Sequence, residues 1–191
     1  MRQEGKKNLR WNTMKILAVG FLGVILIGAV LLWLPICNEK PISFLDALFT
    51  STTSVCVTGL ITIVPKYQFT IVGKVVLLLL IQIGGLGIVA CVAAFFMIMR
   101  RKITLKERIV IQETYNMDSL GGLVGMVRRI LLGTLVVEGA GAVLYAIQFV
   151  PDFGLLKGIW YAVFHSVSAF CNAGIDILGE DSLAKYVTNP L

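Results

Sequence analysis

Two short segments of the chain carry small polar residues and glycines in a pattern suited to binding an ion. The first reads TSTTSVCVTGL from Thr50 to Leu60, and the second reads SAFCNAGIDIL from Ser168 to Leu178. Because Gly accepts backbone angles that other residues avoid, an extended stretch ending in Gly can direct its carbonyl groups toward one axis. A ring of such carbonyls can replace the hydration shell of a monovalent cation. The two segments therefore predict cation binding by the backbone.

Covalent catalysis is not indicated by the sequence. His165 and Cys171 are the one pair that could supply a base and a nucleophile, but they are six residues apart across a helix end, and no orienting acid follows a known pattern. The four cysteines show neither CxxC nor metal-site spacing, and the sequence has no phosphate loop and no HExxH motif. We expect neither enzyme activity nor a cofactor.

The two segments belong to an internal repeat. When Asp46–Leu60 is placed over Tyr161–Ile175, a shift of 115, five of 15 positions are identical. The identical pairs are Ala47 with Ala162, Phe49 with Phe164, Ser51 with Ser166, Cys56 with Cys171, and Gly59 with Gly174. The chain is therefore expected to form the same local structure twice.

Each repeated glycine follows a helical segment that is too short to cross a membrane. Pro41–Leu60 and Leu155–Ile175 each contain about a dozen helix-compatible residues, a length typical of a re-entrant segment. Ser43 with Asp46 three residues later predicts a capped helix start, so Asp46 is interpreted mainly as part of that cap. A half-helix that aims its partly negative C-terminal end at a water-filled cavity favours a cation there.

Composition places the chain in a membrane. It is 57% hydrophobic and 15% charged, with a mean hydropathy of +0.86, whereas soluble domains are about half apolar and a quarter charged. Three apolar runs are long enough to span a bilayer: Ile16–Leu34, Val75–Met99 and Ile130–Val150. The predicted fold class is an all-α polytopic membrane protein with helix–pore loop–helix repeats, comprising three transmembrane helices and two re-entrant pore half-helices.

The positive charges predict the topology. Of the 17 Lys and Arg residues, 12 lie before the first apolar run or between the second and third, which places the N-terminus and the basic loop on the cytoplasmic side. The basic residues are not interleaved with aromatic residues on one face, so no nucleic acid partner is expected. The predicted domains are a first repeat at 1–99, a basic loop at 100–129 and an incomplete second repeat at 130–191. The loop is expected to consist of helix tails joined by a turn near Ser119, Gly121 and Gly122.

Several polar residues allow two interpretations. Glu138 lies in the middle of an apolar run, where it could attract or gate cations, or could be hydrogen-bonded to another helix; the second is our expectation. Asp176 could raise the cation concentration at a pore mouth or could simply be solvated. The hydroxyl groups of Thr52–Ser54 could line a pore or could bond back to helix carbonyls.

The order of these elements and the two glycine loops resemble those of the Trk/Ktr/HKT superfamily of K+ transporters, with the Ktr-type membrane subunit as the most similar branch. The resemblance covers nearly the whole chain. It implies four repeats in one protein, with K+ held by backbone carbonyls of a filter. By position, the filter residues would be Val57, Thr58, Gly59, Asn172, Ala173 and Gly174. Cys56, Cys171, Asp176 and Glu138 are secondary candidates.

The resemblance also implies partners and a location. These are a homodimer of full-length subunits in the lipid bilayer of the plasma membrane, and a cytoplasmic nucleotide-binding regulatory subunit that could contact the basic loop at Arg100–Arg108. A Ser in place of the first filter Gly accompanies Na+ selectivity in plant-type members, so Gly59 favours K+ over Na+. The chain stops where a fourth long helix should begin, which suggests a fragment or a truncated product.

The function expected from the sequence is therefore K+ uptake, as the N-terminal portion of a four-repeat transporter. Two alternatives remain open at this point. The complete protein could be a Na+-permeable member of the same superfamily, or the chain could be a truncated, non-conducting membrane interaction module.

Overall fold

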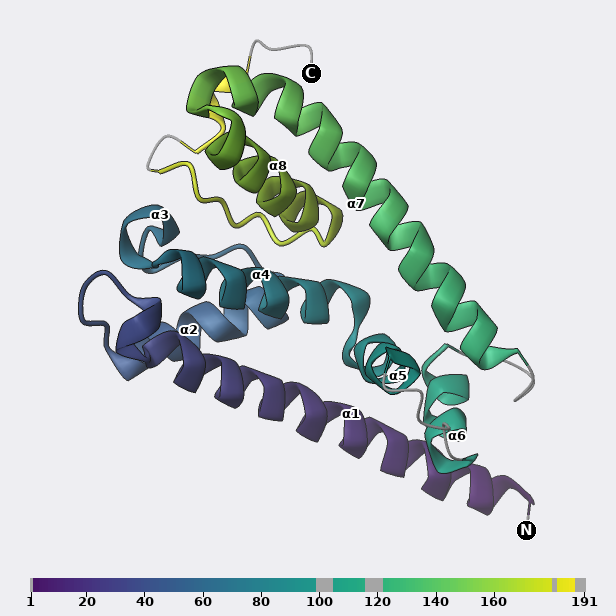
Figure 1. Ribbon diagram of the computed structural model, residues 1–191. Coiled ribbons are helices and arrows are strands. Elements are labelled where there is room, and N and C mark those ends of the chain that lie inside the picture. The colour runs from purple at the N-terminus through teal and green to yellow at the C-terminus, as the bar shows by residue number, and fades with distance from the viewer. Residues whose placement is uncertain (1, 99–104, 116–121, 180–181, 188–191) are drawn as a thin grey trace. The chain divides into compact units, whose positions relative to one another are not determined.

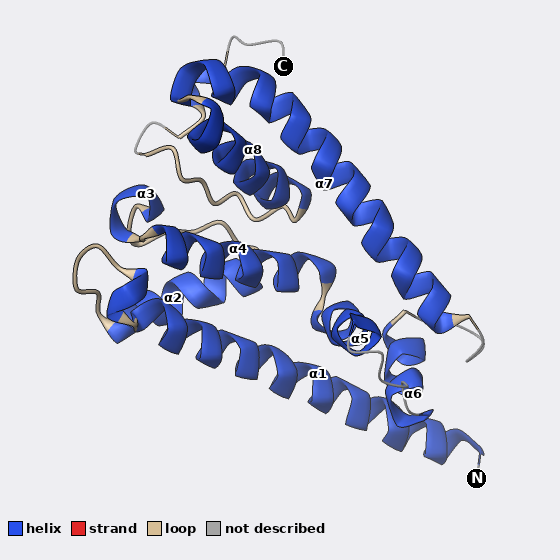
Figure 2. Cartoon of the chain, in the orientation of Figure 1, coloured by secondary structure: helices blue, strands red, loops and turns tan. Residues whose placement is uncertain are grey.

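The computed structural model describes residues 2–98, 105–115, 122–179 and 182–187 (Figure 1). These residues form helices and loops, and the only strand-like pairing among them is an isolated bridge between Asn38 and Phe69 (Figure 2). The predicted all-helical class is confirmed. In chain order the elements are α1 (Arg2–Trp33), η1 (Pro35–Cys37), α2 (Phe44–Val55), α3 (Pro65–Gln68), α4 (Ile71–Leu86), α5 (Ile88–Ile98), α6 (Leu105–Thr114), α7 (Leu123–Phe153), α8 (Leu155–Phe170) and η2 (Ala184–Tyr186).

The chain divides into two compact units. The first comprises Met1–Gly23 and Leu86–Thr134, and the second comprises Val24–Gly85 and Leu135–Leu191. Both α2 and α8, with the glycine loops that follow them, belong to the second unit.

Two helices are long and apolar enough to cross a membrane. Their apolar parts are Met14–Trp33 in α1, with a mean hydropathy of 2.7, and Val124–Phe153 in α7, with a mean hydropathy of 2.0. Only 17% and 11% of these stretches are buried within the chain, so most of their apolar side chains face outward, as lipid contact requires. The first and third predicted spans therefore each lie in one continuous helix that is long and apolar enough to cross a membrane.

The second predicted span, Val75–Met99, is not one continuous helix. α4 ends at Leu86 and α5 begins at Ile88, and Gly87 between them has a φ of +83°. A residue with left-handed backbone angles ends the helical hydrogen-bond ladder, and Gly adopts such angles without steric cost. The prediction of an unbroken helix was therefore wrong. The two segments count as a third span only when they are taken together.

The first unit has its own small apolar core. Its buried residues are Val89 and Ala93 of α5, Ile111 of α6 and Val127 of α7. In the predicted basic loop, α6 packs into this core through Ile111. The turn predicted near Ser119 and Gly121 lies outside the described residues, as does the Arg100–Lys102 part of the loop.

In the second unit, the two half-helices begin in different ways. The Ser43 side chain accepts a hydrogen bond from the Asp46 amide at 3.1 Å and donates one to the Asp46 carboxylate at 2.7 Å, so the predicted cap is confirmed. α8 follows a turn at Gly154, whose φ is +82°, and runs back beside α7 (Figure 1). Gly158 permits this tight return, since a Cβ there would lie 2.7 Å from the Phe149 carbonyl oxygen of α7.

Candidate functional site

The loops that follow α2 and α8 share an unusual backbone pattern. Val57 and Gly59 have φ values of +55° and +74°, and Asn172 and Gly174, each 115 residues later, have values of +58° and +64°. Left-handed angles are uncommon for residues other than Gly, and they are rarest for β-branched residues such as Val. Left-handed residues at alternate positions change the direction of successive peptide groups, so carbonyls that would point to opposite sides of an extended strand can face one side.

The hydrogen bonds that lead into the two loops also repeat at the same offset. In each copy, the amide after the last helical turn bonds four residues back, and the amide two positions later bonds five residues back. In the first copy these bonds are Cys56 N to Thr52 O at 2.8 Å and Thr58 N to Thr53 O at 3.0 Å; in the second they are Cys171 N to Val167 O at 2.9 Å and Ala173 N to Ser168 O at 2.8 Å. The sequence repeat is thus a structural repeat.

A hydroxyl group braces the far end of each loop. Thr53 Oγ1 accepts a hydrogen bond from the Leu60 amide at 3.0 Å and lies 2.6 Å from Thr58 Oγ1. At the matching position, Ser168 Oγ donates to the Ile175 carbonyl oxygen at 2.6 Å. Each hydroxyl therefore links the half-helix to the residue just after the loop's glycine.

The other two hydroxyls considered from the sequence have local roles. Thr52 and Ser54 donate to carbonyl oxygens four residues back, those of Leu48 at 2.7 Å and Thr50 at 2.6 Å. These bonds satisfy the side chains within α2, as hydroxyls in membrane helices commonly do.

The two loops meet at their glycines. A Cβ built on Gly59 would lie 2.8 Å from the carbonyl oxygen of Ala173 and 3.7 Å from Cα of Gly174. A side chain at Gly59 would therefore press on the backbone of the other loop. Of the predicted filter residues, the structure thus brings Gly59 against Ala173 and Gly174.

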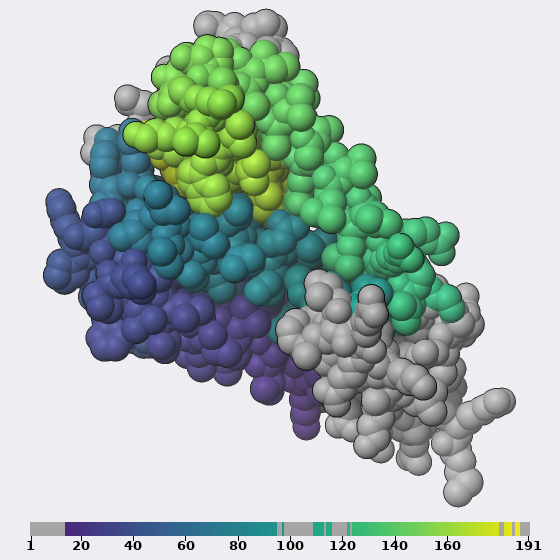
Figure 3. Space-filling view, viewed as in Figure 1, coloured from purple at the N-terminus to yellow at the C-terminus, as the bar shows by residue number. Residues whose placement is uncertain are grey.

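α4 supports both half-helices at the ends from which the loops emerge. A Cβ at Gly84 would overlap the Val55 carbonyl group at the end of α2, and a Cβ at Gly85 would overlap Cys171 at the end of α8. The space-filling view shows the atoms of α4 against those of α8 (Figure 3). Adjacent glycines thus let the backbone of α4 lie directly against the ends of both half-helices.

The repeat also includes the long helices, which the sequence comparison did not reveal. Ser51 Oγ donates to the Ile25 carbonyl of α1 at 2.7 Å, and Ser166 Oγ donates to the Glu138 carbonyl of α7 at 2.6 Å. A Gly lies at each contact, Gly28 and Gly141, where a Cβ would be 2.5 Å from the serine oxygen. The helix positions are offset by 113, not 115, so a search at one fixed shift misses them.

Glu138 is buried, with 7% of its surface exposed, and its partner is on another helix. Gln82 of α4 donates a hydrogen bond from Nε2 to Glu138 Oε1 at 2.8 Å. Cys171 Sγ lies 4.0 Å from Gln82 Oε1, so the same amide reaches the end of α8. The arrangement links the first repeat, through α4, to both helices of the second.

Substitutions of Glu138 can separate the structural role of its hydrogen bond to Gln82 from the role of its negative charge. Glu138→Gln keeps an oxygen acceptor for Gln82, so we expect the unfolding temperature to stay close to wild type. Glu138→Leu leaves the Gln82 donor unsatisfied, and we expect the free energy of unfolding to fall by about 1–3 kcal/mol. Thermal unfolding in detergent measures both changes. A clearly lower unfolding temperature of Glu138→Gln would instead show that the fold requires the negative charge of Glu138.

The remaining candidates differ in their surroundings. Asp176 Oδ1 accepts hydrogen bonds from the amides of Leu178 at 2.9 Å and Gly179 at 3.4 Å, so it caps the turn after the second loop. Cys56 is exposed, whereas its counterpart Cys171 is buried. His165 lies 2.7 Å from the Tyr161 carbonyl oxygen through Nδ1, and its ring packs against the aromatic rings of Phe149 and Phe164 rather than forming part of a catalytic group.

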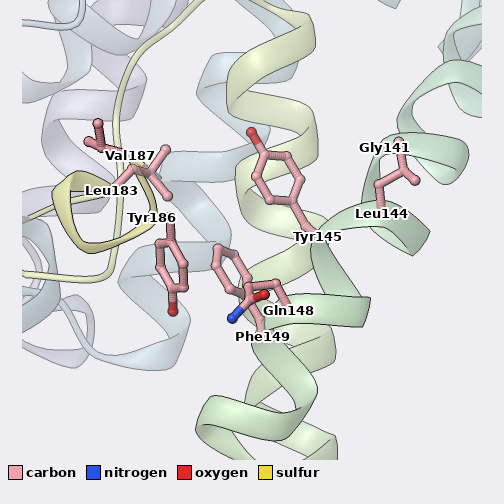
Figure 4. Close-up of a pocket in the computed structure, with 8 residues that line it drawn as sticks. All are labelled: Gly141, Leu144, Tyr145, Gln148, Phe149, Leu183, Tyr186 and Val187. Atoms are coloured by element: carbon pink, nitrogen blue, oxygen red, sulfur yellow. The ribbon is translucent and has the colours of Figure 1, made fainter. Parts of the chain in front are cut away.

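A cavity of about 520 Å³ lies beside α7 (Figure 4). The rings of Phe149 and Tyr186 lie close together at its wall, with their centres 5.5 Å apart. The lining residues are Gly141, Leu144, Tyr145, Gln148, Phe149, Leu183, Tyr186 and Val187. One of these lining residues, Gly141, is also the glycine that lies against Ser166.

Comparison with protein families agrees with this geometry. The TrkH model, described as a cation transport protein, matches residues 2–191. The chain belongs to the TrkH family. This family membership confirms the resemblance inferred from the two loops, and it identifies a membrane protein of a cation transporter family rather than an enzyme.

Individual TrkH relatives are similar along nearly the whole chain. Ktr system potassium uptake protein B of Bacillus subtilis is 42% identical over 184 residues, which cover 96% of this chain and 41% of the relative. Potassium/sodium uptake protein NtpJ of Enterococcus hirae is 40% identical over 96% of this chain and 41% of the relative. Ktr system potassium uptake protein B of Vibrio alginolyticus is 37% identical over 93% of this chain and 39% of the relative. The chain spans about two fifths of the length of these relatives.

Proposed function

We propose that the chain is the N-terminal portion of a plasma-membrane K+ uptake protein and supplies two of the loops of its selectivity filter. The observation that carries the proposal is the meeting of two loops with the same left-handed pattern, at Gly59 and Gly174. The proposed filter residues are Val57–Gly59 and Asn172–Gly174. Their backbone carbonyls would replace the hydration shell of K+.

The half-helices contribute to ion binding in this proposal. The last carbonyls of α2 and α8 carry partial negative charge, and both helices end where the loops begin. The Thr53 and Ser168 hydroxyls would keep the loops from collapsing when the ion leaves, because each ties a loop exit to its half-helix. A complete ring needs about four such loops, so this chain would provide half of it.

The proposed organisation is a repeat at 1–99, a cytoplasmic loop at 100–129 and part of a second repeat at 130–191. In the first repeat, Leu80 of α4 covers Gly28, since a Cβ there would lie 2.7 Å from a Leu80 methyl group. At the equivalent Gly141, only Ser166 lies that close, and the cavity opens beside it. We propose that a helix equivalent to α4, from the rest of the longer protein, fills this cavity.

The proposed partners follow from the family. They are a second full-length subunit and a cytoplasmic nucleotide-binding regulatory subunit, with the N-terminus on the cytoplasmic side as the basic residues predict. K+ is the proposed main substrate because both filter loops have Gly at the key position. A second candidate is Na+ in addition to K+, since one relative that is 40% identical is named as a potassium/sodium uptake protein.

Growth complementation tests the proposed function. The 191-residue chain and the complete protein would each be expressed in cells that lack their own K+ uptake systems, at limiting external K+. We expect rescue by the complete protein alone, because two loops do not form a ring. Failure of the complete protein, with its regulatory subunit present, would contradict K+ uptake. Growth inhibition by added Na+ in the rescued cells would favour the second candidate.

A further inference from the structure

The chain that leaves the second filter loop is held at three points. Ser168 Oγ bonds to the Ile175 carbonyl at 2.6 Å, and Asp176 Oδ1 bonds to the Leu178 amide at 2.9 Å. The third point is the Leu178 carbonyl oxygen, which accepts a hydrogen bond from Lys66 Nζ at 2.6 Å. The first two contacts are local. The third comes from α3, which follows the first filter loop and lies 112 residues earlier.

Lys66 is itself held in this position by its surroundings. Gly179, with a φ of +129°, lies against the Lys66 side chain, and a Cβ there would be 3.2 Å from Lys66 Cδ and 3.3 Å from Nζ. The Lys66 carbonyl oxygen accepts a hydrogen bond from Lys74 Nζ of α4 at 3.0 Å. Both the backbone and the side chain of Lys66 therefore make contacts that restrict where its ammonium group can lie.

The chain after the second loop is held differently from the chain after the first loop. At the offset of 115, Asp176 corresponds to Ile61 and Leu178 to Ile63, so the first loop has an apolar residue in place of the aspartate cap. The Leu178 peptide is bonded on both sides, its amide by Asp176 and its carbonyl by Lys66. Its position consequently depends on a residue of the other repeat.

We propose that Lys66 is a positioning residue that sets the second filter loop against the first. Its charged amino group makes a stronger hydrogen bond to a carbonyl than a neutral donor would. The hydrogen bond from Lys66 to the Leu178 carbonyl, called the tether below, joins the chain that follows one filter loop to the chain that follows the other. The two loops meet at Gly59 and Gly174. Because ion preference depends on the number and spacing of carbonyl groups, a residue that fixes this spacing determines specificity without touching the ion.

Three variants of the complete transporter test the proposal. Lys66→Met keeps the length of the side chain and removes the donor and charge, whereas Lys66→Arg keeps both. Lys40→Met is the matched control, since Lys40 is exposed. Its hydrogen bond with Gln68 is made by the Lys40 backbone carbonyl, which the substitution keeps. For Lys66→Met we expect the ratio of K+ to Na+ uptake to fall by about fivefold and KM for K+ to rise, with expression unchanged. Lys66→Arg and Lys40→Met should stay within about twofold of wild type.

A second readout does not depend on transport. Amide hydrogen exchange of the 175–179 segment should become faster in Lys66→Met and remain unchanged in Lys40→Met. Unchanged exchange, or unchanged ion preference in a well-expressed Lys66→Met protein, would overturn the positioning role. The ion readout rests on the proposed function. If wild type itself failed to take up K+, the proposed function would fail while the exchange experiment still decided whether the tether exists.

Discussion

Gly59→Ser in the complete transporter is expected to lower K+ uptake by about tenfold or more, equivalent to ~1.4 kcal/mol, and to weaken the preference for K+ over Na+. Two features of the structure are the reason for this expected loss. Gly59 has a φ of +74°, at which a residue with a side chain is strained, and its Cβ would lie 2.8 Å from the Ala173 carbonyl oxygen. That oxygen belongs to the other glycine loop, so the substitution would displace a proposed ion-binding group directly.

Gly139→Ser is the control for this experiment. Gly139 lies in α7, has no left-handed angle, and a Cβ there would meet nothing within 4 Å. We expect its uptake and its K+ to Na+ ratio to match wild type. Ion uptake in membrane vesicles, normalised to the amount of folded protein, measures both variants. Equal ion preference in Gly59→Ser and wild type would remove Gly59 from the filter.

Gly84→Val is expected to prevent the second unit from packing. A Cβ at Gly84 would overlap the carbonyl group of Val55, which is backbone and cannot rotate away as a long side chain could. Overpacking of this kind typically costs about 1–3 kcal/mol, and here the displaced group belongs to the end of a pore half-helix. We expect a lower yield of monodisperse protein in detergent, a lower unfolding temperature and loss of K+ uptake.

Gly139→Val serves as the matched change, since it adds the same side chain to a helix at a position with open space. Size-exclusion chromatography and thermal unfolding would compare the two variants. A Gly84→Val protein as stable as Gly139→Val would show that α4 does not lie against the end of α2.

The parts of the fold that depend on local patterns could be predicted from the sequence. Hydropathy located α1 and α7 because a bilayer requires a long apolar run, and the repeat located α2 and α8 because their residue types match. The break at Gly87 could not be predicted, since hydropathy reports transfer into lipid and gives no information on helix continuity. The packing of α6 could not be predicted either, because its sequence is mostly polar and its apolar side is buried only in the folded unit.

The site was predicted less completely than the fold. The positions of Gly59 and Gly174 followed from the repeat, but the left-handed Val57 did not, because Val rarely adopts that conformation. The partner of Glu138 is 56 residues away in Gln82, and the partner of Lys66 is 112 residues away. Contacts at such separations depend on tertiary packing, for which a single sequence provides no local signal.

The unequal offsets of the repeat have a consequence for how the gene has changed. The pore segments are related by 115 positions and the long helices by 113, so the connection between Gly141 and Ser166 is two residues longer than that between Gly28 and Ser51. Both glycine–serine contacts are nevertheless present. Descent of the two repeats from one duplicated ancestor would explain this, with insertions or deletions tolerated in the connecting loop but not between residues that contact each other. Homologous chains are expected to vary in length in the same connection.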